Sequence, residues 1–161
     1  KSLPPLLDKI LPDLNDNSNN YKFILRIVGD TSNSSGLYQK YKSDNNVEFV
    51  GFVENLKYEY SNSFCQIVPE GLNTGVRIKI IESLLNGLPV ITSKSELTTL
   101  GIKNLDGCLV VKKHSDYIDI VNSLTNFDFY NQLSKSALKT FKNKFDKNIV
   151  IPQISSFFKS L

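Results

Sequence analysis

The residues best suited to hold an anion lie in the segment from Gly75 to Asn86, which reads G-V-R-I-K-I-I-E-S-L-L-N. A glycine lets the backbone approach a ligand closely, and the free N–H groups at the start of a following helix attract a phosphate. At about 100° per residue, Gly75, Lys79, Glu82 and Asn86 fall within one polar wedge of that helix. The opposite side is apolar and is predicted to pack on the core, through Ile78, Ile80, Ile81, Leu84 and Leu85. The pattern predicts a helix with one packed face and one phosphate-binding face.

Two charged residues lie in this wedge. Lys79 is a candidate for a phosphate contact, because a cationic side chain near a helix start adds to its attraction for an anion. Glu82 lies one turn further on, on the same face that could bind a ligand. Alternatives stay open: Gly75 as a plain turn glycine, Lys79 as a solvated lysine, and Glu82 as its ion-pair partner. Arg77 would face the apolar side of a regular helix, and only an irregular first turn would direct it toward a ligand.

Short apolar segments alternate with helical patterns along the chain. The predicted strands cover residues 23–28, 47–50, 64–68, 90–92 and 108–111. The predicted helices cover residues 3–14, 37–41, 56–60, 75–86, 96–100, 115–124, 129–145 and 151–161. This alternation implies βαβ units, and right-handed crossovers turn such units into a parallel sheet. We therefore expect an α/β, Rossmann-like fold, with one parallel sheet and helices on both of its faces.

Ligands bind such sheets at the carboxyl ends of the strands. These ends carry Gly29 and Asp30, then Phe52 and Val53, then the segment 69–75. Asp30 could equally cap a turn. His114, the single histidine, precedes a predicted helix start and is expected at the surface rather than in a catalytic role.

The order of these motifs is similar to that of a known family. V-G-D at 28–30, V-E-F-V-G-F-V at 47–53 and C-Q-I-V-P at 65–69 precede the glycine-led helix and its continuation G-L-P-V-I-T. Over residues 1–125 or so, the chain resembles the C-terminal, donor-binding half of GT-B glycosyltransferases, of the group 1 type that includes family 4.

This resemblance implies a site for a sugar nucleotide. The helix start would hold the diphosphate, Glu82 the ribose hydroxyls, and the loop at Phe52 and Val53 would lie beside the base. No metal and no further cofactor are implied, and no catalytic residue beyond Lys79 as a leaving-group stabiliser. The implied donor-binding set is Gly29, Asp30, Phe52, Val53, Thr74, Gly75, Val76, Arg77, Lys79 and Glu82.

The chain departs from the family pattern at one position. Thr74 stands eight residues before Glu82, where the family usually carries a glutamate facing the transferred sugar, and Glu70 lies too far upstream to replace it. The resemblance still implies a retaining, hexosyl-type transferase that moves a sugar from a nucleotide to an acceptor such as a glycan or lipid. The alternative is a non-catalytic nucleotide-binding or interaction module. A dinucleotide-dependent oxidoreductase is disfavoured because no G-x-G-x-x-G follows a predicted strand.

Composition narrows the class of protein. The chain has 161 residues and a net charge of +3 from scattered lysines, which favours one globular domain and no nucleic-acid partner. No apolar run approaches the roughly 18 residues that span a bilayer. Cys65 and Cys108 lie in predicted strands without C-x-x-C spacing, so they predict a reducing, cytoplasmic setting and neither zinc nor a disulfide.

The chain starts at Lys1 and has no methionine, so we expect residues 1–161 to be one domain of a longer protein. Its partner would be an N-terminal acceptor domain of the same chain, without which the piece should be inactive; any contact with a membrane surface would come through that half. The segment 146–161 is expected to end in a helix whose apolar positions serve core packing or dock on that missing half. These positions are Ile151, Ile154, Phe157, Phe158 and Leu161.

Overall fold

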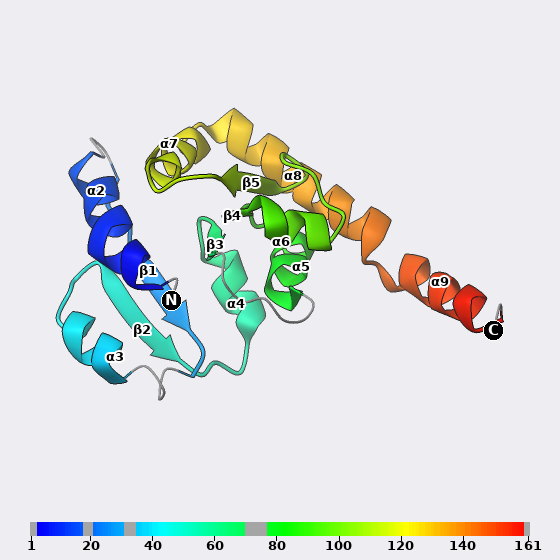
Figure 1. The fold of residues 1–161 in the computed structure, drawn as a ribbon, viewed down its shortest axis with the longest axis horizontal. Helices are drawn as coiled ribbons and strands as arrows, with labels where there is room; N and C mark the ends of the chain where they lie inside the picture. The colour runs from blue at the N-terminus through cyan, green and yellow to red at the C-terminus, as the bar shows by residue number, and fades with distance from the viewer. Residues whose placement is uncertain (1–2, 18–20, 31–34, 70–76, 160–161) are drawn as a thin grey trace.

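The computed structural model describes residues 3–17, 21–30, 35–69 and 77–159. Its strands are β1 (Leu25–Val28), β2 (Val47–Gly51), β3 (Gln66–Val68), β4 (Val90–Ser93) and β5 (Cys108–Val111). All pairings are parallel, as predicted, but they form two sheets, β1-β2 and β3-β4-β5 (Figure 1). The expectation of one continuous sheet is wrong for the described residues because β1 and β3 do not pair. Two strands also start later than predicted, so Cys65 lies just outside β3.

One helical segment near the start of the chain joins the two sheets. It consists of α1 (Leu3–Pro5), the π-helical η1 (Leu6–Ile10) and α2 (Leu11–Asp16), where the predicted spacing put a single helix. Its residues Leu7 and Leu11 pack with residues of the β1-β2 sheet, while others pack with the β3-β4-β5 sheet. The residues on the second side are Leu6, Ile10 and Leu14. Both sheets therefore share this helix as a cover.

Helices cover both faces of the β3-β4-β5 sheet. On one face, α5 (Ile78–Leu85), α6 (Lys94–Thr99) and α8 (Phe127–Lys144) supply a cluster with β4 and β5. Its buried members are Val68, Ile80, Leu84, Val90, Leu97, Ile102, Cys108 and Ala137. On the other face, α7 (Ser115–Leu124) and the first helical segment pack over Ile91 and Leu109. The predicted Rossmann-like α/β class is confirmed.

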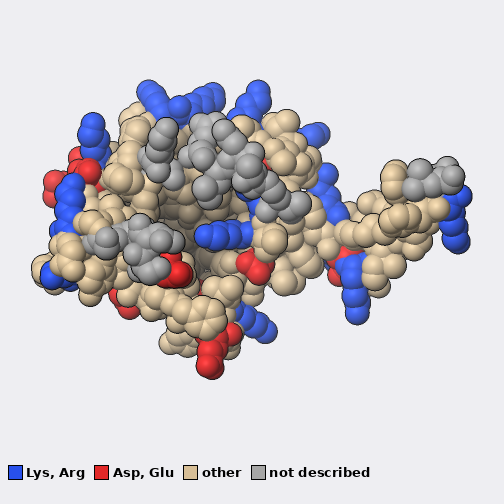
Figure 2. Space-filling view, turned by 60° about the horizontal axis from the view of Figure 1, so that its bottom comes forward, with Lys and Arg blue, Asp and Glu red and all other residues tan. Residues whose placement is uncertain are grey.

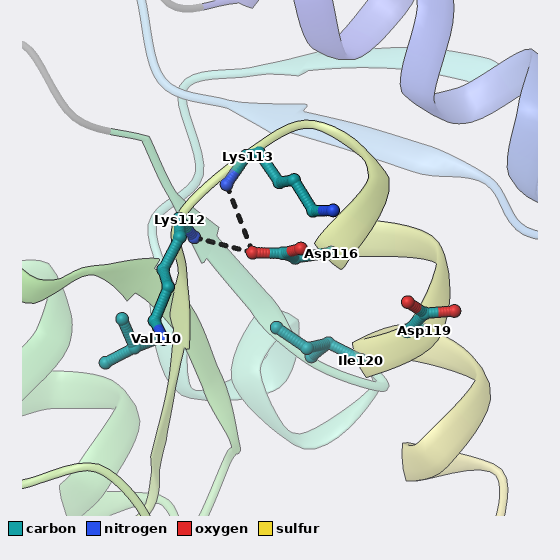
Figure 3. Close-up of a pocket in the computed structure, with 6 residues that line it drawn as sticks. All are labelled: Val110, Lys112, Lys113, Asp116, Asp119 and Ile120. Atoms are coloured by element: carbon teal, nitrogen blue, oxygen red, sulfur yellow. Dashed lines mark hydrogen bonds between the residues drawn. The ribbon is translucent and has the colours of Figure 1, made fainter.

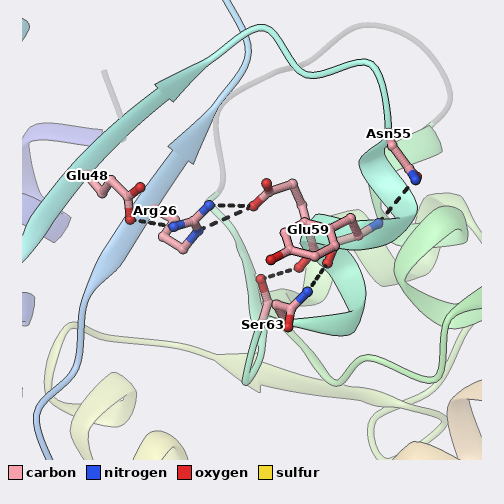
Figure 4. A network of polar contacts seen from close by, with 7 residues as sticks. Arg26, Glu48, Asn55, Glu59 and Ser63 are labelled. Atoms are coloured by element: carbon pink, nitrogen blue, oxygen red, sulfur yellow. Dashed lines mark hydrogen bonds and ion pairs between the residues drawn. The ribbon is translucent and has the colours of Figure 1, made fainter.

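The two faces of the β1-β2 sheet are covered by different helices. α3 (Ser35–Tyr41) lies on the same side as the first helical segment, and Lys40 pairs with Asp8 at 2.6 Å. α4 (Leu56–Ser61) is held by Arg26 of β1, whose Nη2 donates to Glu59 Oε2 at 2.8 Å (Figure 4). The same guanidinium pairs with Glu48 of β2. Arg26 therefore ties both strands to the helix that leads into β3.

The last helix, α9 (Lys147–Lys159), extends away from the rest of the molecule (Figure 1). The helix was predicted, but none of its described residues is buried. Its large apolar side chains are exposed: Ile149, Ile151, Ile154, Phe157 and Phe158. Of the two expectations for this stripe, core packing within the chain is wrong for the described residues.

Candidate functional site

The central helix of the predicted site, α5, starts later than the sequence indicated. It begins at Ile78 after an N-cap at Arg77, whose φ of −79° and ψ of 65° lie outside the helical range. The predicted residues Thr74, Gly75 and Val76 lie outside the described part of the chain. Their role as an anion cradle therefore stays a prediction.

The packed face of α5 is narrower than predicted. Ile80 and Leu84 are fully buried and Ser83 lies between them, but Ile78 and Leu85 are 61% and 50% exposed. Only these three residues, which lie on one side of the helix, face the sheet and α8. A short helix contacts a flat layer along one narrow stripe. The prediction that Ile78 and Leu85 pack on the core is wrong.

The C-terminus of α5 is closed by a glycine. Gly87 has φ +67°, its N–H donates to Leu84 O at 3.1 Å, and the Leu88 N–H donates to Ser83 O at 2.9 Å. These two bonds form a Schellman motif, which uses the left-handed conformation that glycine adopts without strain. The helix that carries Glu82 is thus anchored at its end.

Glu82 is half-buried and is bound by a tyrosine from another helix. The Tyr60 hydroxyl, on α4, donates to Glu82 Oε2 at 2.9 Å. Lys79 is exposed, and in the described part of the chain no ion pair joins it to Glu82. The alternative that Glu82 serves as the partner of Lys79 is therefore wrong.

Polar contacts join α5 to two other elements. Burial, and next the hydrogen bond to Glu82, raise the pKa of Tyr60 far above its ordinary value, while the side chain of Gln66 acts in the opposite direction. The fully buried Ser83 hydroxyl donates to Gln66 Oε1. Helix α5 is thus linked to α4 through Glu82 and to β3 through Ser83.

Arg77 has a non-helical backbone conformation, which was the condition for it to point away from the packed face of α5. Its guanidinium nevertheless pairs with Glu96 of α6. Nε donates to Glu96 Oε2, and Nη2 donates to Oε1 at 3.0 Å. The side chains are only 14% and 4% exposed. A donor contact by Arg77 stays a prediction, and the geometry gives this residue a structural partner.

The ends of β1 and β2, which four predicted residues follow or form, are joined by a backbone hydrogen bond. The Gly29 N–H donates to Gly51 O at 2.8 Å, and both glycines have positive φ, +119° and +75°. Asp30 is exposed, Phe52 is 84% exposed and Val53 is half-buried. Phe52 directly follows β2, and an exposed aromatic ring at this edge is suited to stack on a flat ligand.

The face shown in Figure 2 is hollowed at its centre, with basic and acidic side chains both at the hollow. Lys and Arg are spread over this face rather than gathered. Separately, an open pocket of about 500 Å³ lies at the end of β5 and the start of α7 (Figure 3). Its lining is Val110, Lys112, Lys113, Asp116, Asp119 and Ile120, none of which belongs to the predicted donor set.

One carboxylate that lines the pocket in Figure 3 is already bound by the backbone. Asp116 accepts the backbone N–H groups of Lys112 and Lys113 at 2.8 and 3.1 Å, which lowers its pKa. A second pocket, about 240 Å³, lies against the ends of β3, β4 and β5, and the exposed His114 lines it. Neither pocket contains a residue of the predicted donor set, in contrast to the buried contacts at Glu82.

Neither a metal cluster nor a membrane span is found where the chain is described. No group of three or more His, Cys, Asp or Glu side chains there could hold a metal ion. Within the same residues, no helix is long and apolar enough to cross a bilayer.

In the comparison with protein families, residues 1–126 match the model described as glycosyl transferases group 1. The chain belongs to this family. Comparison with curated protein sequences gives no match. The group 1 assignment agrees with the resemblance carried by the motifs at strand ends and at α5.

Solved structures resemble this group 1 glycosyltransferase chain in fold. Anabaena HepE in complex with UDP superposes with a TM-score of 0.75 at 19% identity, covering 100% of this chain and 47% of that one. A glycosyltransferase from Rickettsia africae gives 0.73 at 20%, covering 99% and 45%. The pneumococcal O-GlcNAc transferase GtfA gives 0.73 at 13%, covering 98% and 33%. The chain spans less than half the length of these structures.

Sequence reasoning missed several polar residues of this glycosyltransferase chain. Tyr60, Gln66 and Ser83 come from three elements, and Glu96 lies 19 residues beyond its partner Arg77. No local spacing joins such residues. The available signal was the serine on the packed side of an otherwise apolar helix stripe, since a buried hydroxyl needs a partner.

Proposed function

We propose that the chain is the nucleotide-sugar-binding part of a retaining glycosyltransferase, which transfers a hexosyl group to a glycan or lipid acceptor. The family match supports the reaction class. The similar HepE protein was solved with UDP and with UDP-glucose, which supports a nucleotide diphosphate-sugar as donor. The two unpaired cysteines support a cytoplasmic setting.

The observation that carries this proposal is the state of Glu82. A half-buried carboxylate on α5 receives one neutral hydrogen bond, from Tyr60 at 2.9 Å, and no cation among the described residues neutralises it. A carboxylate offers about four acceptor positions. Glu82 therefore keeps capacity for the two hydroxyls of a ribose.

The other predicted residues take roles around that contact. Backbone N–H groups near Gly75 and the Lys79 ammonium would hold the diphosphate and stabilise its charge as the glycosidic bond breaks, with no metal. Phe52 and Val53 would lie beside the base, and Gly29 and Asp30 complete the edge. The acceptor would come from a second domain across a cleft, so this piece alone should not turn over.

A second candidate is a module that binds a nucleotide or partner without transferring sugar. Thr74 favours it, because the position lacks the carboxylate that the family usually directs at the sugar. The two candidates differ in turnover, and binding of a nucleotide through Glu82 is expected of the transferase and of a nucleotide-binding module, but not of a module that binds only a protein partner.

The test is titration calorimetry on this chain within its complete natural protein, with UDP, GDP and ADP and their sugar conjugates. Glu82→Ala should weaken binding of one nucleotide by about 1 to 3 kcal/mol, the usual range for a lost hydrogen bond to a charged group. Asp13→Ala, which removes an exposed carboxylate on the first helical segment, is the matched control and should change nothing. Equal affinities for Glu82→Ala and the parent would contradict the proposed site.

A further inference from the structure

We propose that Tyr60 is a positioning residue that orients the Glu82 carboxylate and thereby sets the preference for ribose over 2′-deoxyribose. The inference rests on the proposed function and extends it to a residue on another helix. It depends on three features of the structure: the contact itself, its fixed direction, and the independent anchoring of α4.

The contact joins two helices at the side chain that matters. The Tyr60 hydroxyl donates to Oε2 of Glu82 at 2.9 Å, and both side chains are half-buried. A free glutamate rotates about three side-chain bonds, whereas one fixed oxygen leaves the carboxylate plane with little freedom. The second oxygen, Oε1, then has a defined direction for a ligand hydroxyl.

The direction of this hydrogen bond is set by its surroundings. An ionised carboxylate only accepts, so the phenol must donate. The bond therefore runs from Tyr60 to Glu82, and Oε1 of the carboxylate is left to accept from a ligand.

The helix that carries Tyr60 is anchored without the phenol hydroxyl. Glu59, its neighbour, is buried and accepts from Nη2 and Nε of Arg26 at 2.8 and 3.3 Å (Figure 4). Asn55 caps the start of α4 by accepting the Tyr58 N–H at 3.3 Å. Removal of one hydroxyl should leave α4 in place and release only the carboxylate of Glu82.

Ribose differs from 2′-deoxyribose by one hydroxyl, so orientation of Glu82 is expressed in discrimination between the two sugars. A held carboxylate meets both hydroxyls at good geometry, whereas a released one loses more with the diol than with the single hydroxyl. If the released carboxylate loses the equivalent of one hydrogen bond to the diol, the ratio of the two dissociation constants should fall about 3- to 10-fold.

The experiment measures dissociation constants of UDP, GDP and ADP and of their 2′-deoxy forms in the complete protein. The parent should bind one ribonucleotide better than its 2′-deoxy form, and Tyr60→Phe should reduce that ratio about 3- to 10-fold. Tyr58→Phe is the matched control, because Tyr58 lies on the same helix, is 63% exposed, and should leave the ratio unchanged.

A second measurement guards against a folding defect in Tyr60→Phe. Urea unfolding of Tyr60→Phe, beside the parent and Tyr58→Phe, shows whether the variant is folded under the conditions of the binding assay. An unchanged ratio in a folded Tyr60→Phe, with ribose preference intact in the parent, overturns the positioning role alone. Absence of binding by every nucleotide overturns the proposed function and this inference with it.

Discussion

Glu82 and Arg77 stand five residues apart and use their charges in opposite ways. Arg77 makes a two-pronged ion pair with Glu96, and both side chains are largely removed from water. Glu82 receives a single hydrogen bond from a neutral phenol. A charge that is fully paired within the protein stabilises the fold, whereas a carboxylate with unused acceptor positions can still bind a ligand. This contrast separates the two residues more clearly than their shared membership of the α5 motif.

The Cys108 thiol should be inert in the folded protein. It has no exposed surface, and burial raises its pKa to about 12, with the Asp106 charge as a smaller cause. At pH 8 the reactive thiolate would then be about one part in ten thousand. In a Cys65→Ser variant, we expect a thiol reagent to label Cys108 within minutes in about 8 M urea, where the protein is unfolded. In buffer without urea, labelling should be orders of magnitude slower. Rapid labelling in buffer would show that β5 opens freely.

At the scale of elements, the Arg77–Glu96 pair should be the main link between the start of α5 and α6. Arg77→Ala leaves the 4%-exposed Glu96 carboxylate without this partner, and breaking a buried pair costs about 3 to 5 kcal/mol. The double change Arg77→Met with Glu96→Leu should recover most of that loss, since it removes both charges. Urea unfolding measures each value. Lys79→Ala, at an exposed neighbour, is the control and should stay within about 0.5 kcal/mol.

If the single and double variants lose equal stability, the loss comes from packing rather than from a stranded charge, and the pair is not the link that we describe.

Gly107, the residue before β5, lies in close contact with α8. Its φ is +90°, and a Cβ there would lie 2.4 Å from Ala137 Cα. Gly101 also has positive φ, +61°, but its nearest neighbour would be the flexible Lys144 Nζ at 3.7 Å. We expect Gly101→Ala to cost about 1 to 2 kcal/mol from backbone strain, and Gly107→Ala about 1 to 3 kcal/mol more from overpacking. Thermal or urea unfolding of both variants compares them, and equal losses would contradict a close contact.

Most elements could be predicted because their signals are local. Ser115–Leu124 matches its predicted helix at both ends, and the apolar run at Cys108–Val111 matches its strand. The packed stripe of α5 could not be predicted from periodicity, because Ile78 and Leu85 differ from Ile80 and Leu84 only in what other elements place beside them. For the same reason Glu82 was found, as a polar residue on a helix, while its partner Tyr60 on another helix was not.

At the scale of the molecule, each of the two sheets has helices on both faces, as in a doubly wound fold. The first helical segment and α3 lie on one face of β1-β2, while Arg26 directs α4 to the other. The strands that border the division, β1 and β3, carry apolar residues that are mostly half-buried, whereas Val90 and Ile91 of β4 are fully buried. Parallel strands are normally buried on both faces. The boundary between β1 and β3 therefore has the features of an incomplete sheet interior.

The right-handed rule for crossovers predicts where a further strand would fit. The chain passes from β1 to β2 through α3, and the first helical segment lies on the same face of the sheet as α3. A right-handed crossover that passes through the first helical segment into β1 must therefore start from a strand on the side of β1 away from β2. That side borders β3. The solved relatives are more than twice as long as this chain, so a longer natural protein has residues to supply such a strand.

We expect a parallel strand from the rest of the protein to pair with β1 and β3 in the full-length form. Alternate residues of a parallel strand turn their N–H groups to opposite sides. Leu25 donates to Asn46 O at 2.8 Å and Gln66 to Pro89 O at 2.9 Å, so Arg26, Val28 and Ile67 turn theirs toward the boundary. Amide hydrogen exchange at these three positions should slow at least tenfold, about 1.4 kcal/mol of added protection, from the 161-residue chain to the full-length protein. Leu25 and Gln66, already bonded, report any global change in stability. If all five amides slow equally, the remainder of the protein stabilises the fold without filling this position, and the sheets stay separate.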